Sequence, residues 1–213
     1  MPFDLADYAQ LRPFLYHLTA RENLPGIRTD RRLDSAATLL QAANLEADVR
    51  LRREGPKHIN IGKRKVVLRD QRPLHRGPIV FPLGYVFEDF VELLNRRVFF
   101  WAGQEHGPAG PAKTYGGNHF ETYSSERPVI LRINFMSLMS ANEGQQPLFC
   151  QYNSGAPRCS RGHHAPRGPN TFLHPAMFPK SAAGVAEVTF ADHVGLPDDT
   201  MVASQFGTQW KPL

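Results

Sequence analysis

Two polar residues lie inside apolar segments typical of β-strands, and their side chains can do acid–base or electrostatic chemistry. His17 lies in "FLYHLT" (residues 14–19), and Glu187 lies in "VAEVTF" (residues 185–190). Each has an ordinary structural explanation, because a core histidine is usually hydrogen-bonded and a mid-strand glutamate usually faces solvent from a one-sided sheet. Alternation along a strand divides the second segment into two faces, Ala186, Val188 and Phe190 against Val185, Glu187 and Thr189. The question is whether the fold brings the imidazole and the carboxylate to one cleft.

The elements that must position these residues follow from hydrophobic periodicity and turn signals. After the first strand we expect a short Pro-containing helix within ten residues. Residues 35–54 read as a helix with Ser35 as its cap, and residues 86–95 are the clearest amphipathic helix. The remaining expected elements are strands at 65–70, 96–101, 127–135 and 184–194, and loops at 101–118 and 153–184.

The composition favours one mixed domain with long loops. The chain has 213 residues, 41% of them hydrophobic, which is enough for a substantial core. Its 18 prolines and 17 glycines argue against a helical bundle. No internal repeat and no convincing boundary divide the chain. We therefore predict a single α+β domain over residues 1–213.

Cysteine content and hydropathy predict the compartment. Cys150 and Cys159 are too few for a disulfide framework. Residues 1–14 lack the basic and apolar regions of a secretory signal, and no apolar run approaches the roughly 20 residues of a membrane span. We expect a cytoplasmic protein with no membrane partner.

Positive charge is concentrated in residues 50–76. This segment holds ten Lys and Arg residues against Glu54 and Asp70, so it carries +8 while the rest of the chain carries −3. A second basic cluster is "RCSRGHHAPR" at 158–167. Such segments attract nucleic-acid phosphates, and a solvated surface that keeps the protein soluble is the plainer alternative. If nucleic acid is the acceptor, the predicted contacts are Arg64, Lys65, Arg69 and Arg97.

Three motifs in order give the chain a family resemblance. "YHLTARENLPGI", "RVFFW" and "VAEVTF" resemble the ADP-ribosyltransferases, and within them the DarT-like toxins that modify DNA bases. The chain is also similar to an uncharacterised bacterial family that shares "YHLT", "RDQRPL", "LNRRVFFW" and "NSG". The resemblance extends over nearly the whole chain, although each motif is short. It implies an ADP-ribosyltransferase-like split, mixed or antiparallel sheet with flanking helices and long loops.

The resemblance also implies a reaction and its site. NAD⁺ would be the substrate, no metal would be needed, and ADP-ribose would pass to an acceptor, a DNA base foremost, with release of nicotinamide. Glu187 would stabilise the oxocarbenium-like charge of the transition state and help to deprotonate the acceptor. The residues implied for NAD⁺ binding are His17 at the ribose, the backbone at Leu18, Thr19, and the aromatic rings of Phe100, Trp101 and Tyr115. As a toxin, the protein would have an antitoxin or hydrolase partner.

One departure from the DarT-like pattern concerns a cation. That group has an arginine shortly after its aromatic strand, whereas here "AGQEHG" follows. Arg97 before the strand and Lys113 after it are the nearest substitutes, which puts the choice of acceptor in doubt more than the NAD⁺ chemistry. A protein or small-molecule acceptor therefore stays open.

Three other interpretations compete. A zinc site from Cys150, Cys159 and nearby histidines lacks the short spacing of metal knuckles. A tRNA 2′-phosphotransferase would need an arginine cluster that we cannot assign. A non-enzymatic, basic nucleic-acid-binding module is the strongest alternative of a different class, although no aromatic-basic RNA-binding motif supports it.

Overall fold

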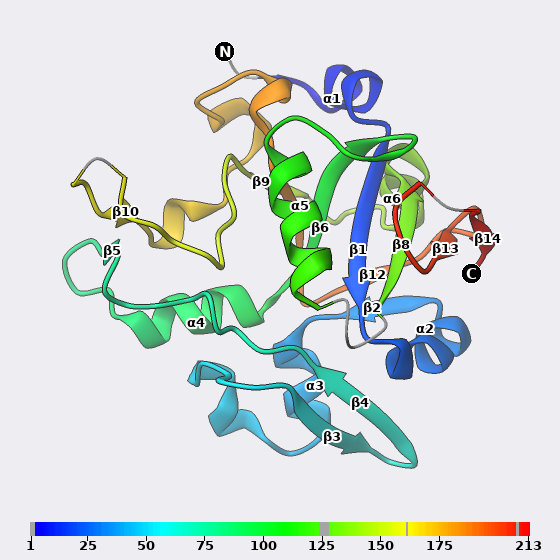
Figure 1. The fold of residues 1–213 in the computed structure, drawn as a ribbon, viewed down its shortest axis with the longest axis horizontal. Helices are drawn as coiled ribbons and strands as arrows, with labels where there is room; N and C mark the ends of the chain where they lie inside the picture. Colours follow the sequence, from blue (N-terminus) through cyan, green and yellow to red (C-terminus); the bar gives the residue numbers. More distant parts are fainter. Residues whose placement is uncertain (1–2, 124–127, 161, 208) are drawn as a thin grey trace.

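The computed structural model describes residues 3–123, 128–160, 162–207 and 209–213, and a largely antiparallel β-sheet lies at its centre (Figure 1). The strands follow the order β14-β13-β8-β1-β6-β11-β9, and β7 pairs with β6. Their bounds are β1 Phe14–Thr19, β6 Arg97–Gln104, β7 Gly107–Pro108, β8 Val129–Asn134, β9 Leu148–Cys150, β11 Glu187–Ala191, β13 Met201–Ala203 and β14 Lys211–Pro212.

Among the described residues, three two-stranded pairs lie outside this sheet. Two are antiparallel, and the β5–β10 pair is parallel. The pairs are β2 Arg32–Asp34 with β12 His193–Gly195, β3 Lys57–Ile61 with β4 Arg64–Leu68, and β5 Ile79–Val80 with β10 Ala165–Pro166.

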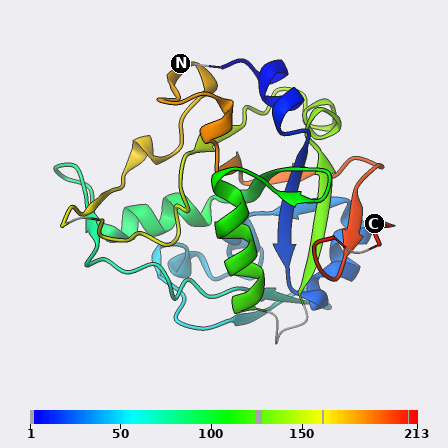
Figure 2. The ribbon, with the colours of Figure 1, turned by 45° about the horizontal axis from the view of Figure 1, so that its top comes forward.

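Six α-helices lie among the described residues, and Figures 1 and 2 show α5 crossing in front of β6 at the middle of the sheet. The helices are α1 Leu5–Leu11, α2 Leu24–Asp30, α3 Ala36–Ala42, α4 Phe87–Asn95, α5 Pro111–Thr122 and α6 Phe135–Ala141. Short 3₁₀ turns are η1 Arg21–Asn23, η2 Glu46–Arg50, η4 Pro169–Thr171, η5 Pro175–Met177 and η6 Ala182–Gly184.

The central sheet is divided between β1 and β6. These strands pair only from Phe14, opposite Gly103, to Tyr16, opposite Trp101. Beyond that point β1 continues along β8 as far as Thr19, and β6 continues along β11 as far as Arg97. The sheet therefore opens into two halves, with His17 at the start of the opening.

Alternation along the strands separates a core face from the opposite face. On β6 and β11, Val98, Phe100, Val188 and Phe190 enter the largest hydrophobic cluster, which also contains Leu15 of β1. A second cluster packs α4 against the segments that follow β4 and β9, through Leu74, Phe90, Leu94 and Phe172. A third packs α3 and η2 on the β3–β4 hairpin. Apolar burial at these positions is what holds the sheet, α4 and the hairpin together.

The α+β class predicted from the sequence is confirmed, as are several elements. The first strand is β1, the Pro-containing helix is α2, and the amphipathic helix is α4. Ser35 caps α3, because its Oγ accepts a hydrogen bond from the Thr38 N–H at 3.2 Å. The strands expected at 65–70, 96–101 and 127–135 are present as β4, β6 and β8, with residue 127 of the last one outside the described residues. Residues 153–184, where described, are mainly loop.

Three expectations about element bounds are wrong. The helix expected over 35–54 ends at Ala42, and Asn44, with a φ of 56°, separates it from η2. The late strand expected over 184–194 is two strands, because Asp192 with a φ of 53° breaks it. The loop expected over 101–118 contains the end of β6, all of β7 and most of α5.

The start of α5 explains the third error. Gly110 has a φ of 60°, and Pro111 occupies the first turn of the helix. A glycine that allows this backbone and a proline with a preset φ begin a helix as readily as they form a loop. Tyr115, expected in a loop, therefore lies on a helix.

Among the described residues, no helix combines the length and apolar character that crossing a membrane requires.

Candidate active site

A cavity of about 300 Å³ lies where the central sheet opens. Its wall is built by the open ends of β1 and β6, by β11, by α5 and by two loop segments, residues 69–74 and 153–156. Both residues that raised the question of a cleft, His17 and Glu187, line it. The wall combines apolar side chains with many polar and charged ones, so the cavity is suited to a polar small molecule.

Glu187 is the buried carboxylate of this cavity. It lies on β11 opposite Trp101 of β6 and is only 4% exposed. The Ser154 N–H donates to both carboxylate oxygens, at 3.3 and 3.2 Å. Burial raises the pKa of Glu187 to about 7, against the opposing effects of the Ser154 hydrogen bonds and the Arg167 charge. The carboxylate can therefore exchange a proton near neutral pH.

Arg167 holds the loop that carries Ser154. Its guanidinium is buried and donates to the carbonyl oxygens of Pro166 at 2.9 Å, Ser154 at 3.4 Å and Asn153 at 3.5 Å. It also lies over the Tyr152 ring, with its Cζ 4.0 Å from the ring centroid. These contacts fix the "NSG" segment so that the Ser154 N–H points at Glu187.

His17 occupies the opening between β1 and β6. Its Nδ1 is 2.9 Å from the Phe99 carbonyl oxygen, a group that β1 no longer pairs with at this point. Since a carbonyl only accepts, Nδ1 is the protonated nitrogen and Nε2 carries the lone pair. Burial lowers the pKa of His17 to about 4, although the Phe99 hydrogen bond opposes this effect, and the Arg69 charge lowers it further. The ring is neutral at pH 7, and Nε2 can accept a hydrogen bond from a ligand hydroxyl.

The α5 side of the cavity presents an aromatic and polar cluster. His119 lies between Trp101 and Tyr123, with ring centroids 6.1 and 4.8 Å away. Burial lowers the pKa of His119 to about 4, and the Arg69 charge adds to this. The Tyr123 hydroxyl donates to the Asp70 carboxylate at 2.8 Å.

The "RDQ" segment after β4 is held from behind by Arg53. The Arg53 guanidinium donates to the Arg69 carbonyl at 2.7 Å and to Asn95 Oδ1 at 2.8 Å. Burial lowers its pKa to about 10. This contact fixes the cavity wall at Arg69 and Asp70, so Arg53 supports the site without being free to bind a polyanion.

Most residues implied for the site lie on the cavity wall. Those lining it are His17, Leu18, Thr19, Arg69, Arg97, Trp101 and Glu187. Thr19 Oγ1 accepts from Asn23 Nδ2 at 3.2 Å, and Arg97 donates to Thr189 Oγ1 at 3.2 Å. Burial lowers the pKa of Arg97. The structure shows that these residues line the cavity, and their roles in binding remain predictions.

Phe100 and Tyr115 lie elsewhere. Phe100 is 1% exposed and points into the main core, where it packs on Phe190. The strand pleat explains this, because the neighbouring Phe99 and Trp101 face the cavity. Tyr115 is not part of the cavity wall, and its ring lies beside that of Trp101, at a centroid distance of 6.3 Å.

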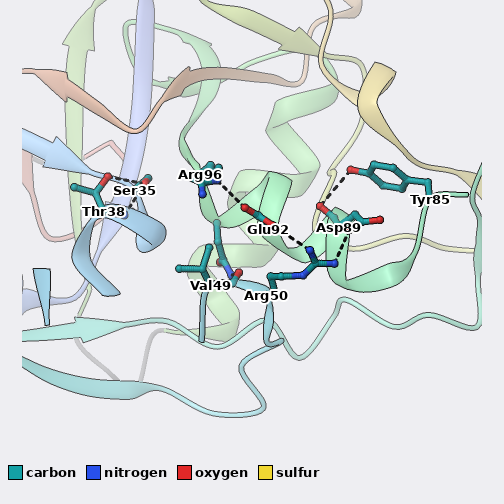
Figure 3. Close-up of polar contacts among 9 residues, drawn as sticks. Ser35, Thr38, Val49, Arg50, Tyr85, Asp89, Glu92 and Arg96 are labelled. Carbon is teal, nitrogen blue, oxygen red and sulfur yellow. Dashed lines mark hydrogen bonds and ion pairs between the residues drawn. The ribbon is translucent and has the colours of Figure 1, made fainter. Parts of the chain in front are cut away.

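Three of the ten cations in the basic segment at 50–76 form ion pairs with carboxylates from other parts of the chain. Figure 3 shows Arg50 of η2 reaching Asp89 and Glu92 on α4. Lys57 pairs with Asp48, and Arg64 pairs with Asp30 at the edge of a smaller cavity. Of the four residues predicted to contact nucleic acid, Lys65 alone is exposed, on the β3–β4 hairpin outside the main cavity.

The sequence did not identify His119, Tyr123, Ser154 and Arg167 as site residues. His119 and Tyr123 follow Tyr115 at intervals of four, a helical spacing that was hidden by the expectation of a loop. Ser154 lies in the quoted "NSG" motif, but nothing local indicated which carboxylate its N–H would bind.

Within the described ranges, no group of three or more His, Cys, Asp or Glu side chains is arranged to hold a metal ion. Cys150 is buried, whereas Cys159 is exposed, with its Sγ 3.9 Å from His164 Nδ1.

The chain belongs to a family of unknown function, DUF7002, whose match extends over residues 13–201. This range contains every residue of the candidate site. No curated protein of established function matches the chain.

Proposed function

We propose that this member of DUF7002 is an NAD⁺-dependent mono-ADP-ribosyltransferase with Glu187 as its catalytic carboxylate and a nucleic acid, foremost a DNA base, as its acceptor. The observation that carries the proposal is the position of Glu187. It is a buried, ionisable carboxylate in a cavity that a neutral histidine, His17, also lines. The resemblance of the three motifs to the ADP-ribosyltransferases supports this reaction for the arrangement.

In the proposed reaction, the bond between the ribose C1′ and the nicotinamide nitrogen breaks, and its electron pair leaves with neutral nicotinamide. Positive charge develops on the ribose, as in glycoside cleavage. A fixed carboxylate in a water-poor cavity stabilises that charge strongly. The lone pair of the acceptor then forms the new bond at C1′, and the acceptor proton passes to Glu187.

The other cavity groups support binding in this proposal. Nε2 of His17 accepts a hydrogen bond from a ribose hydroxyl, because Nδ1 is committed to the Phe99 carbonyl. Trp101 offers the aromatic face beside the carboxylate, since it lies opposite Glu187 in the strand register. Arg69 and Arg97 both line the cavity wall, and in this proposal their positive charge lies near a diphosphate or an acceptor phosphate.

The test is nicotinamide release from NAD⁺, measured with the pure protein alone and with single-stranded DNA, RNA or protein extract. Glu187→Gln removes the negative charge and keeps the size of the side chain, so its folded state can be checked by circular dichroism. We expect release with one acceptor class and a loss of at least about 100-fold in the variant. A fully active variant would exclude Glu187 as the catalytic group.

If the protein neither releases nicotinamide nor binds NAD⁺ under any of these conditions, the proposal is wrong. A non-enzymatic nucleic-acid-binding module would then be the leading alternative.

A further inference from the structure

An apolar loop, "PIVFPLGYVF" at residues 78–87, connects β5 to α4. The Tyr85 hydroxyl is the only polar side-chain group in this stretch. A run of this kind is usually buried, and contiguous apolar side chains that stay exposed mark a contact with a partner. Here Leu83 is fully exposed, and Val80 and Val86 are each about half exposed.

The backbone of this loop is fixed by local contacts. The Tyr85 N–H donates to the Pro82 carbonyl at 3.1 Å, which closes a turn with Leu83 at its tip. Phe81 attaches the loop to α4, because its ring centroid lies 6.1 Å from that of Phe90. The exposed apolar side chains therefore point outward from an ordered loop, and little conformational entropy is lost when a partner covers them.

Two arginines lie at the same edge of the molecule as this loop. Arg76 precedes it, and the Arg76 carbonyl accepts from the Ile79 N–H at 3.0 Å. Arg158 lies on the segment that leads to β10, which pairs with β5. Figures 1 and 2 show these two segments side by side. Both arginines are exposed, and neither forms an ion pair with any described residue.

Carboxylates are sparse around the loop. Residues 71–87 and 144–186 contain no Asp or Glu. The first carboxylates after the loop are Glu88 and Asp89 of α4, and Asp89 is paired with Arg50. Glu88 is exposed and opposes the two arginines in part. The loop therefore combines an apolar tip with a net positive surrounding, which suits an anionic partner.

We propose that the loop of residues 78–87 is a peripheral membrane contact and that its partner is an anionic phospholipid surface. The apolar tip enters the boundary between headgroups and acyl chains, while Arg76 and Arg158 stay at the headgroup phosphates. The projecting tip favours lipid over protein as the partner. A fluid bilayer yields around a fully exposed Leu83, whereas a folded protein would need a matching pocket.

This contact is independent of the proposed reaction, because none of residues 78–87 lines the main cavity. The expectation of no membrane partner rests on the lack of a spanning segment, which does not bear on a short loop that enters only the interface. Membrane binding can therefore be tested without NAD⁺ and without any acceptor.

The experiment measures co-sedimentation of the full chain with vesicles of phosphatidylcholine, prepared with and without phosphatidylglycerol. The loop variant combines Val80→Ser and Leu83→Ser. Its matched control combines Leu51→Ser and Met136→Ser, two apolar side chains that are about half exposed elsewhere on the surface. All four side chains are exposed, so both variants should keep the fold, which circular dichroism checks.

We expect wild type to bind anionic vesicles at least about tenfold more tightly than neutral ones. The loop variant should bind the anionic vesicles at least about tenfold more weakly than wild type, because it loses the burial of a leucine and a valine. The control variant should stay within about twofold of wild type.

Charge variants test the second part of the proposal. Arg76→Gln with Arg158→Gln should weaken binding to anionic vesicles about tenfold, and Glu88→Gln should strengthen it about threefold. Lys63→Gln with Lys65→Gln removes the same charge from the exposed side of the β3–β4 hairpin and should have little effect.

A direct readout is the fluorescence of Leu83→Trp. We expect its emission to shift to shorter wavelength when anionic vesicles are added, because the indole moves into the interface. An unchanged spectrum contradicts the proposal. Equal binding of wild type to anionic and neutral vesicles, or equal losses in the loop variant and its control, overturns it. So does a wild-type dimer that is lost in the loop variant and does not bind vesicles, since the loop is then a contact between two copies of the chain.

Discussion

The carboxylate side and the imidazole side of the cavity differ in burial and in the charges nearby: Glu187 is buried, whereas His17 and His119 are partly exposed. Glu187 receives a backbone N–H and faces the Arg167 charge, which limits how far burial raises its pKa. His17 and His119 have the positive Arg69 nearby, which adds to the effect of burial on their pKa values. The result is a carboxylate that titrates near neutral pH beside imidazoles that stay neutral there.

This difference gives the two sides different chemical roles. A group whose pKa lies near the working pH can hold or release a proton and carry the charge that stabilises a cation. A neutral imidazole with one committed nitrogen can bind and orient a ligand. The comparison therefore assigns charge stabilisation to Glu187 and substrate orientation to His17, and each assignment can be tested separately.

The largest expected effect concerns the pH dependence of stability. The folded-state pKa of Glu187 is raised to about 7, so the unfolded state loses its proton first and wild-type stability falls as pH rises toward 7. Glu187→Gln removes this loss, and from about pH 5.5 to about pH 8.5 the variant should gain about 2 kcal/mol relative to wild type. Urea unfolding at both pH values measures the difference.

An exposed glutamate serves as the control for that measurement. Glu46→Gln, in η2 and outside the cavity, should show no such pH-dependent gain. A gain for Glu187→Gln that is the same at both pH values would mean that the Glu187 carboxyl does not titrate in this range.

The next effect concerns NAD⁺ binding. His17→Ala removes a hydrogen bond to the ligand and should weaken NAD⁺ binding about tenfold, measured by calorimetry. His58→Ala, on the exposed face of β3, should leave the binding constant unchanged. Unchanged NAD⁺ affinity in the His17 variant would remove His17 from the binding site.

The smallest expected effect concerns the Arg167 charge, which limits how far the pKa of Glu187 rises on the carboxylate side of the cavity. Arg167→Gln removes the charge that opposes protonation of Glu187, so the pKa of Glu187 should rise. Nicotinamide release at pH 7 should then fall severalfold and recover toward higher pH. Arg167→Lys keeps the charge and should shift the profile less.

A readout independent of activity accompanies this prediction. Carbon-13 NMR of the labelled glutamate carboxyls, assigned with Glu187→Gln, follows the titration of Glu187 directly. An identical midpoint in wild type and Arg167→Gln would show that Arg167 serves only to hold the loop.

The sequence predicts local features of this site better than long-range ones. It identifies β1, α4 and the strand with Glu187, because hydrophobic periodicity and the flanking turns are local signals. It does not reveal that Ser154 binds Glu187, since 33 residues separate the two. It also misses α5, because a glycine followed by a proline, as at the start of this helix, is equally common in loops.

The distribution of charge is likewise difficult to predict from the sequence, because ion pairs join residues that are far apart in the chain. The +8 of residues 50–76 counts only neighbours in sequence, whereas Asp30, Asp48, Asp89 and Glu92 neutralise several of its cations in space.

The most direct test of the central claim is the pH profile of nicotinamide release from NAD⁺ by wild type and Glu187→Gln. If Glu187 is the catalytic carboxylate, wild-type release rises with pH with a midpoint near the pKa of about 7. Release by the variant stays at least about 100-fold below wild type across the same pH range and has no such midpoint. Release by the variant at the wild-type rate, with the same midpoint, would contradict the assignment of the reaction to this carboxylate.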